Sequence, residues 1–145
     1  MSSPRVFLDT NVLLYTADRH DPVRQRRCRS HLRALSESGC TVISTQVLQE
    51  FYAAATLKLG IAPPKAREIL TSLRQIPTVT LTPDLIDQAI VCHQADRISF
   101  RDALIIVAAG SADCSILLSE DLNAGQTIRG VRVENPSTWE VEPGA

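Results

Sequence analysis

Two acidic residues follow short apolar runs, at points where buried strands are expected to end. Asp9 comes directly after the apolar residues 6–8, and Asp121 follows a second apolar run, 116–118, through Ser119 and Glu120. In open parallel α/β sheets, ligands bind beyond the carboxyl ends of the strands. We therefore expect Asp9, Ser119 and Asp121 to share one edge of a sheet with the small polar pair 44–45, which follows the strand predicted over 41–43.

Two further acids lie on predicted helices that begin near the same edge. Glu50 lies about two turns into the helix that follows the second strand. Asp102 lies in the first turn of a helix predicted from Phe100 to about Ala109, whose residues are nearly all apolar. A helix that is apolar on most faces is buried, so its first turn is expected to face a strand edge.

Each acid also has a purely structural interpretation, which the sequence leaves open. Asp9 or Asn11 caps the following helix in this interpretation, and Asp102 belongs to a capping box with Ser99. Glu50 is then an exposed helix residue and Asp121 a turn aspartate.

A cluster of these acids would need a cation. Two carboxylates about 4 Å apart repel by roughly 4 kcal/mol at an effective dielectric constant of 20. Carboxylate oxygens are ligands that suit Mg²⁺ or Mn²⁺. Zinc is not expected, because the four cysteines are widely separated and the three histidines are not at ligand spacing with them. The cysteines are residues 28, 40, 92 and 114, and the histidines are residues 20, 31 and 93.

Short strands alternating with helices predict a parallel sheet with helices on both faces. The strands are expected over 6–8, 41–43, 78–81, 115–118 and 131–133, with a loop over 123–126 and a tail over 140–145. With 145 residues, 44% of them hydrophobic, the chain is expected to form a single domain, residues 1–145. It has no apolar run near the ~20 residues of a membrane span and no signal-peptide core, so we expect a cytoplasmic protein.

The net charge of −1 does not by itself indicate a nucleic-acid-binding protein, but arginine is unevenly distributed. Six arginines lie between residues 19 and 33, beside a single acid, Asp21. Their helix could follow a phosphate backbone, with Arg24 and Arg27 as contacts. A plain solvated helix face explains the same pattern.

Four segments together resemble a known family. They are Phe7–Leu13, Ser44–Phe51, Ile98–Ile105 and Leu118–Gln126, and in this order and spacing the chain resembles the PIN-domain ribonucleases, in particular the VapC-type toxins of toxin–antitoxin pairs. The resemblance implies a three-layer α/β/α fold with strand order 3-2-1-4-5.

The resemblance also implies roles for particular residues. The metal-binding acids of the family fall on Asp9, Glu50, Asp102 and Asp121, and its supporting polar positions on Thr10, Asn11 and Ser119. Arg101 departs from the family, where many members carry an aromatic residue. It adds a positive charge beside the site that could aid phosphate contact or alter substrate choice.

The implied activity is hydrolysis of RNA with Mg²⁺ or Mn²⁺. The implied partners are a small VapB-like antitoxin that covers the site and a second copy of the chain in a homodimer. A catalytically silent relative that only binds or co-regulates is the alternative. A phosphoryl-transfer enzyme with Asp9 as nucleophile fits less well, because residue 11 is Asn and both lysines, Lys58 and Lys65, lie on other helices.

Overall fold

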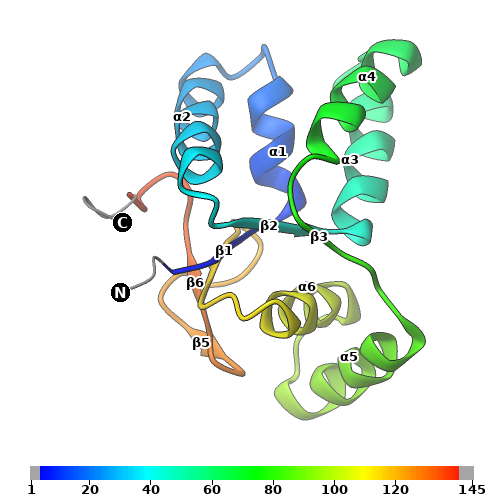
Figure 1. Ribbon diagram of the computed structural model, residues 1–145, viewed down its shortest axis with the longest axis vertical. Coiled ribbons are helices and arrows are strands. Elements are labelled where there is room, and N and C mark those ends of the chain that lie inside the picture. The colour runs from blue at the N-terminus through cyan, green and yellow to red at the C-terminus, as the bar shows by residue number, and fades with distance from the viewer. Residues whose placement is uncertain (1–3, 141–145) are drawn as a thin grey trace.

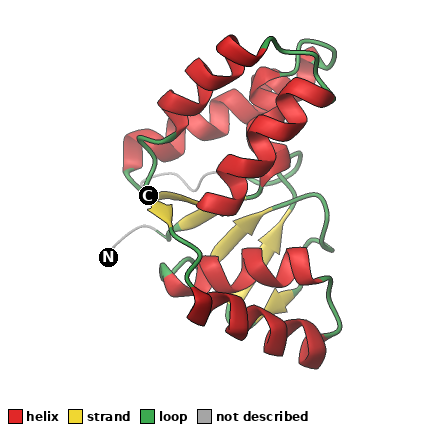
Figure 2. Ribbon diagram, turned by 90° about the vertical axis from the view of Figure 1, so that its right-hand side faces the viewer, coloured by secondary structure: helices red, strands yellow, loops and turns green. Residues whose placement is uncertain are grey.

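A six-stranded sheet separates two layers of helices in the computed structural model, which describes residues 4–140 (Figures 1 and 2). One face carries α1 (Thr10–Ala17), α2 (Pro22–Ser38), α3 (Thr45–Leu57) and α4 (Pro63–Leu73). The other face carries α5 (Pro83–Asp96) and α6 (Phe100–Ser111). The predicted three-layer α/β/α fold is therefore confirmed.

The strand order extends the predicted one by an additional strand. The strands are β1 (Val6–Leu8), β2 (Thr41–Ser44), β3 (Thr78–Val79), β4 (Ile116–Leu118), β5 (Thr127–Ile128) and β6 (Val131–Glu134). Their order is β3-β2-β1-β4-β6-β5, so the predicted fifth strand is β6. The prediction of a parallel sheet is confirmed for the five predicted strands. The additional strand, β5, pairs antiparallel to β6.

The additional strand depends on a tight turn. Arg129 and Gly130 join β5 to β6, and both have positive φ, 49° and 82°. Two consecutive positive φ values are typical of the two-residue turn that closes a hairpin. A strand of two residues is too short to show a hydrophobic period, which is why the sequence did not reveal it.

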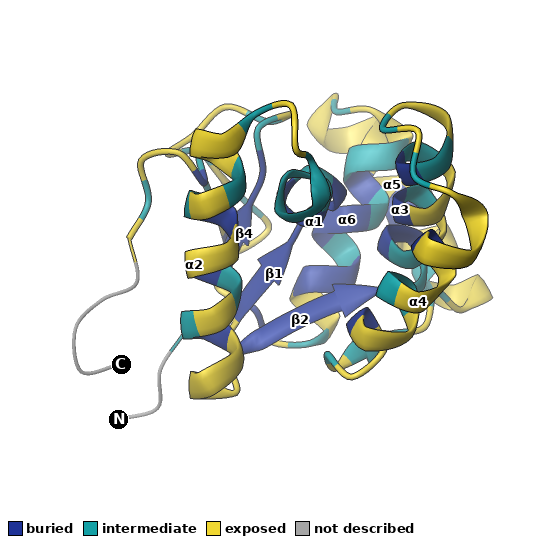
Figure 3. Cartoon of the chain, turned by 90° about the horizontal axis from the view of Figure 1, so that it is seen from above, coloured by how far each residue is buried: buried dark blue, intermediate teal, exposed yellow. Residues whose placement is uncertain are grey.

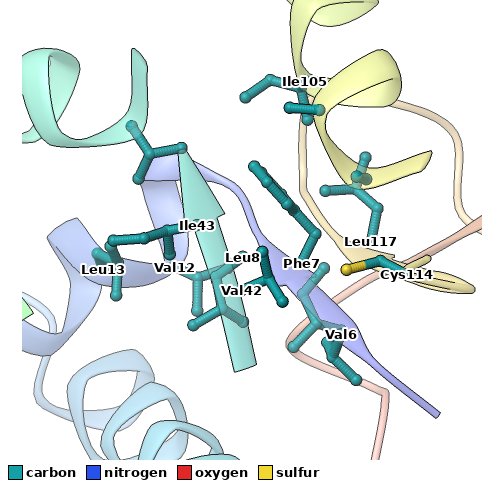
Figure 4. Packing of buried hydrophobic residues seen from close by; sticks show 14 of the residues in the cluster. Val6, Phe7, Leu8, Val12, Leu13, Val42, Ile43, Ile105, Cys114 and Leu117 are labelled. Atoms are coloured by element: carbon teal, nitrogen blue, oxygen red, sulfur yellow. The ribbon is translucent and has the colours of Figure 1, made fainter. Parts of the chain in front are cut away.

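The central strands are apolar and buried on both faces, as expected of parallel strands covered by helices. Val6, Phe7 and Leu8 of β1 are each at most 1% exposed. Phe7 is the register partner of Leu117 on β4, and its ring points toward Ile105 of α6 (Figure 4). This packing fixes β1, and hence Asp9 at its carboxyl end, against α6.

Side-chain caps set where the helices begin. Asp9, Ser44, Thr82 and Ser99 each accept a hydrogen bond from a backbone N–H in the first turn of α1, α3, α5 and α6 respectively. Such caps satisfy N–H groups that have no partner within the helix. The caps that the sequence allowed at Asp9 and Ser99 are therefore present.

The arginine-rich helix α2 presents a largely exposed outer face, whereas the strands beneath it are buried (Figure 3). Over residues 4–140, no helix is both long and apolar enough to cross a membrane. Of the predicted tail, only Glu140 belongs to the described residues.

Candidate functional site

The four predicted acids meet at the carboxyl edge of the sheet. Asp9 follows β1, Asp121 lies just beyond β4, Glu50 comes from α3, and Asp102 from the first turn of α6. Their carboxylates surround a single positive group, the guanidinium of Arg101. Residues separated by up to 112 positions in the sequence thus share one small site.

Arg101 is within ion-pair distance of all four acids. Its Nη2 lies 2.6 Å from Asp9 Oδ1 and 2.7 Å from Glu50 Oε1. Its Nη1 lies 3.1 Å from Asp102 Oδ1 and 3.2 Å from Asp121 Oδ2. The sequence placed this arginine beside the site, but the structure places its guanidinium among the acids.

Asp9 is the most buried of the acids, with only 1% of the residue exposed. Its Oδ1 accepts a 2.7 Å hydrogen bond from the backbone N–H of Thr10, and Asp9 thereby caps α1. Its Oδ2 accepts a 2.7 Å bond from the hydroxyl of Ser119 at the end of β4. The capping interpretation and the site interpretation therefore apply to the same carboxylate.

The supporting polar residues orient the other acids. Thr10 donates from its hydroxyl to Glu50 Oε1 at 2.6 Å, and Asn11 donates from Nδ2 to Asp121 Oδ1 at 3.1 Å. Ser119 Oγ accepts the backbone N–H of Asp121 at 3.1 Å. Thr10, Asn11 and Ser119 thus each form a hydrogen bond with at least one of the acids.

Gln46 belongs to this network, and the sequence reasoning did not assign it a role. Its Nε2 donates to Glu50 Oε2 at 3.3 Å and to the backbone carbonyl of Arg101 at 3.2 Å. The available signal was its spacing of four residues from Glu50, which places both side chains on one face of α3.

Electrostatics within the site follow from burial and from the single cation. Burial raises the pKa of Glu50, but hydrogen bonds from Arg101 and Thr10 outweigh it, so the pKa lies below its usual value. Burial lowers the pKa of Arg101, but hydrogen bonds to Asp9 and Glu50 raise it further than burial lowers it. Arg101 is thus permanently charged.

The pKa of Asp121 is shifted in the opposite direction to that of Glu50. Burial and the negative charge of Asp9 raise its pKa above the usual aspartate value, despite the attraction of Arg101. One guanidinium therefore does not compensate all of the negative charge at this site.

The donor set suits a hard divalent ion, because it consists of carboxylate oxygens with hydroxyl and amide groups around them. Within residues 4–140, however, no three acidic, histidine or cysteine side chains are grouped as they would be around a bound ion. The acids instead converge on the guanidinium, which acts as a stand-in cation. The residues fit a metal ion in chemistry, while Arg101 holds the central position.

A pocket of about 460 Å³ opens beside the acids. Glu50, Asp121 and Arg101 form its polar end, and α3 provides an apolar wall that includes Ala53, Ala54 and Leu57. Lys58 lines the pocket as well, at the end of α3.

The other two predicted RNA-contacting arginines are engaged elsewhere. Arg24 lies over the ring of Tyr15 and donates to its hydroxyl at 2.8 Å. Arg27 donates to the backbone carbonyls of Pro136 and Trp139 at 3.2 and 3.3 Å. Neither arginine contacts the four acids, and both contacts support the structural interpretation of this helix.

Several solved structures share this fold. A DNA-bound VapBC from Salmonella typhimurium aligns with a TM-score of 0.67 at 18% identity, covering 92% of this chain and 98% of the other. VapC20 from Mycobacterium tuberculosis, described as a sarcin-ricin loop cleaving toxin, aligns with a TM-score of 0.60 at 18% identity, covering 88% and 98%. VapBC2 from Rickettsia felis, bound to a promoter DNA fragment, aligns with a TM-score of 0.67 at 16% identity, covering 93% and 98%.

At these identities the solved structures establish the fold alone. No curated protein matches the sequence. The family model of the PIN domain matches residues 6–127, which contain all four acids and Arg101. The chain therefore belongs to the PIN domain family.

Proposed function

We propose that this chain is a metal-dependent ribonuclease and the toxin of a VapBC-like toxin–antitoxin pair, acting in the cytoplasm. The observation that carries the proposal is the meeting of four carboxylates, from four separate segments, around one cation. A fold does not gather this much like charge without a cation to hold it together.

Asp9 and Asp102 would hold Mg²⁺ or Mn²⁺ directly, and Glu50 and Asp121 would complete the site. When bound, the ion supplies a Lewis acid that polarises a phosphoryl oxygen and acidifies water. Thr10, Asn11 and Ser119 keep the carboxylates oriented through the hydrogen bonds described above. In the hydrolysis, a bond forms between the oxygen of water and phosphorus, the bond to the leaving ribose oxygen breaks, and that oxygen takes up a proton.

The pocket beside the acids supports an RNA substrate. Lys58 would attract a phosphate as the only lysine on its lining, and the apolar wall of α3 would contact a ribose or base. One fold relative is described as cleaving the sarcin-ricin loop, and others are described as VapBC complexes. By analogy we propose RNA loops or single strands as substrate, a small antitoxin as partner, and a homodimer as the active assembly.

A catalytically silent PIN protein is the second candidate. The observation that favours it is the guanidinium within the acid cluster, together with the lack of a ready-made ion site over residues 4–140. In this case Arg101 would replace the metal permanently, and the surface would serve only to bind a partner.

Induction of the chain in growing cells distinguishes the two candidates. The wild type is expected to stop growth and to produce new RNA 5′ ends, whereas Asp9→Asn and Asp102→Asn do neither. Asp87→Asn is the matched control, because it changes an exposed aspartate on α5 outside the acid cluster. Co-expression of the neighbouring small open reading frame should restore growth.

Two results would contradict the proposal. Equal growth arrest by wild type and both site variants would show that the acids are not needed. Normal growth with unchanged RNA ends in the wild type, at confirmed expression, would favour the silent protein.

A further inference from the structure

Arg101 has an unusual position for a cation. It lies in the first turn of α6, where the helix dipole favours negative side chains and disfavours positive ones. Its guanidinium is held there by four acids, with ion-pair distances from 2.6 to 3.2 Å. Within residues 4–140, no other lysine or arginine forms an ion pair with these acids. The helix dipole does not explain why an arginine lies at this position, whereas the attraction of the four acids does.

We infer, building on the proposed function of this site, that Arg101 is a built-in counter-cation. Its guanidinium closes the acid site in the metal-free protein and has to leave before a divalent ion can enter. The observation that carries this inference is that Arg101 and the ion would use the same oxygens. Asp9 Oδ1 and Glu50 Oε1 both contact Nη2 of Arg101 at less than 2.8 Å.

Simultaneous occupancy is disfavoured by charge and by space. A divalent ion among the carboxylates would lie against the guanidinium, and like charges at such short distances repel strongly. The partly buried position of the site limits screening by salt. The two cations therefore exchange at this site and do not share it.

Arg101 has an exit path that Asp9, the most buried of the acids, lacks. About 32% of its side chain is exposed, whereas Asp9 is almost fully buried. Arg101 also lines the pocket that contains Lys58, so the displaced guanidinium can rotate into that pocket while its backbone stays in α6. There it would meet a substrate phosphate together with Lys58, so displacement links metal entry to binding of RNA.

Competition of this kind lowers the apparent affinity for the metal. If the guanidinium leaves the site open in about one molecule in ten, the metal binds about tenfold more weakly than to a permanently open site. The protein is then inactive at low concentrations of the ion without any partner. The arginine sets the ion concentration at which the site fills.

Titration of metal-free protein with Mn²⁺, in the absence of RNA, tests this inference. The electron paramagnetic resonance signal of the free ion gives the bound fraction directly. Arg101→Gln is expected to bind Mn²⁺ about tenfold or more tightly than the wild type, and Arg101→Lys to lie between them. Arg67→Gln is the matched control, since Arg67 is exposed on α4 and is expected to match the wild type.

An added substitution places the ion. Asp9→Asn in the Arg101→Gln background should remove the gain in affinity, since it takes away the most buried of the four carboxylates. Circular dichroism confirms folding of each variant. Where Arg101→Gln does not fold without metal, the comparison of Arg101→Lys with the wild type carries the test.

The outcomes separate this inference from the proposed function. Equal Mn²⁺ affinity in wild type and Arg101→Gln, lost in Asp9→Asn, overturns the inference and leaves the metal-dependent enzyme standing. Binding in Arg101→Gln but not in the wild type supports the arginine's role and overturns the metal-dependent enzyme. No binding to either protein, even at millimolar Mn²⁺, overturns both.

Discussion

Charge at the acid site is unbalanced, because one guanidinium faces four carboxylates. The imbalance affects Asp121, where burial and the charge of Asp9 raise the pKa of the carboxyl group. A carboxyl group with a raised pKa in the folded state destabilises the fold when it is ionised. The metal-free protein is therefore expected to carry a stability cost at neutral pH that a cation relieves.

Asp121→Asn is expected to stabilise the metal-free protein at pH 7, because it removes the ionised form that the fold disfavours. The gain should not exceed about 1 kcal/mol, since Asp121 is partly exposed and solvent screens its charge. It should vanish below about pH 3, where aspartate is mostly protonated in both the folded and the unfolded state. Urea unfolding at the two pH values measures it, and a less stable variant at pH 7 would contradict the account.

Single residues were predictable from the sequence to different degrees. Asp9 was predictable because a buried strand must end in a turn, and an acid at that point faces the ligand edge. The direction of Arg101 was not, since a long side chain can reach either solvent or the acids from the same helical position. Gln46 was missed because an amide carries no charge signal of its own.

At the scale of elements, α6 sets the geometry of the site. Its N-cap residue, Ser99, accepts a 3.0 Å hydrogen bond from the backbone N–H of Asp102. This bond fixes the turn that carries both Asp102 and Arg101. The sequence pattern Ser99-x-x-Asp102 indicated a cap, and the structure shows that the cap also positions the site acid.

Ser99→Ala is expected to cost about 1 kcal/mol of stability through loss of the cap, and to change Mn²⁺ affinity as well. Thr82→Ala is the matched control, because Thr82 caps α5 by the same kind of bond at 3.2 Å. Its stability loss should be similar and its Mn²⁺ affinity unchanged. Thermal unfolding and Mn²⁺ titration of both variants measure the two effects; equal Mn²⁺ affinities in the two would contradict a positioning role for α6.

Helix boundaries followed from local chemistry, whereas one strand did not. Pro22 at the start of α2 and Gly39 at its end, with a φ of 72°, are signals that any sequence reading uses. The edge strand β5 depends instead on a turn with positive φ at Arg129, a residue type that rarely adopts it. Pairing with β6 decides that conformation, and pairing is not visible in a short segment.

At the scale of the whole molecule, the last described residues of the chain contact α2. His31 Nε2 lies 2.9 Å from the carbonyl oxygen of Pro136, and its ring lies 5.5 Å from that of Trp139. Arg27 holds the same segment through two backbone carbonyls. The arginine-rich helix thus holds the last described segment of the chain, in addition to any role toward RNA.

The contact between His31 and the last described segment makes the stability of the fold depend on pH, independently of the acid site. Burial lowers the pKa of His31, so the folded state favours the neutral ring. Stability from this contact is present above pH ~6.5, the value for an unperturbed histidine, and declines as the pH falls below it. His31→Gln cannot titrate and should show a smaller loss of stability between pH 7 and 5.5 in urea unfolding; an unchanged pH slope would contradict this.

The order of the sheet was predictable only through the family resemblance, because periodicity predicts strands and helices but not which strands are neighbours. The buried run 6–8 identified a central strand without showing that β2 and β4 flank it. The meeting of Glu50 with Asp121 depends on this order. Contacts between distant segments are the part of the site that local sequence patterns do not determine.

Cleavage of a single-stranded RNA by purified protein tests the central claim most directly, namely that the four carboxylates form the divalent-ion site of a ribonuclease. The wild type should cleave when Mn²⁺ or Mg²⁺ is added and stop when EDTA removes the ion. Asp9→Asn and Asp102→Asn should cleave at least about a hundredfold more slowly, as expected when a group that stabilises the transition state is removed. Circular dichroism checks that both variants are folded. Undiminished cleavage by either variant, or cleavage by the wild type that persists in EDTA, would contradict the account.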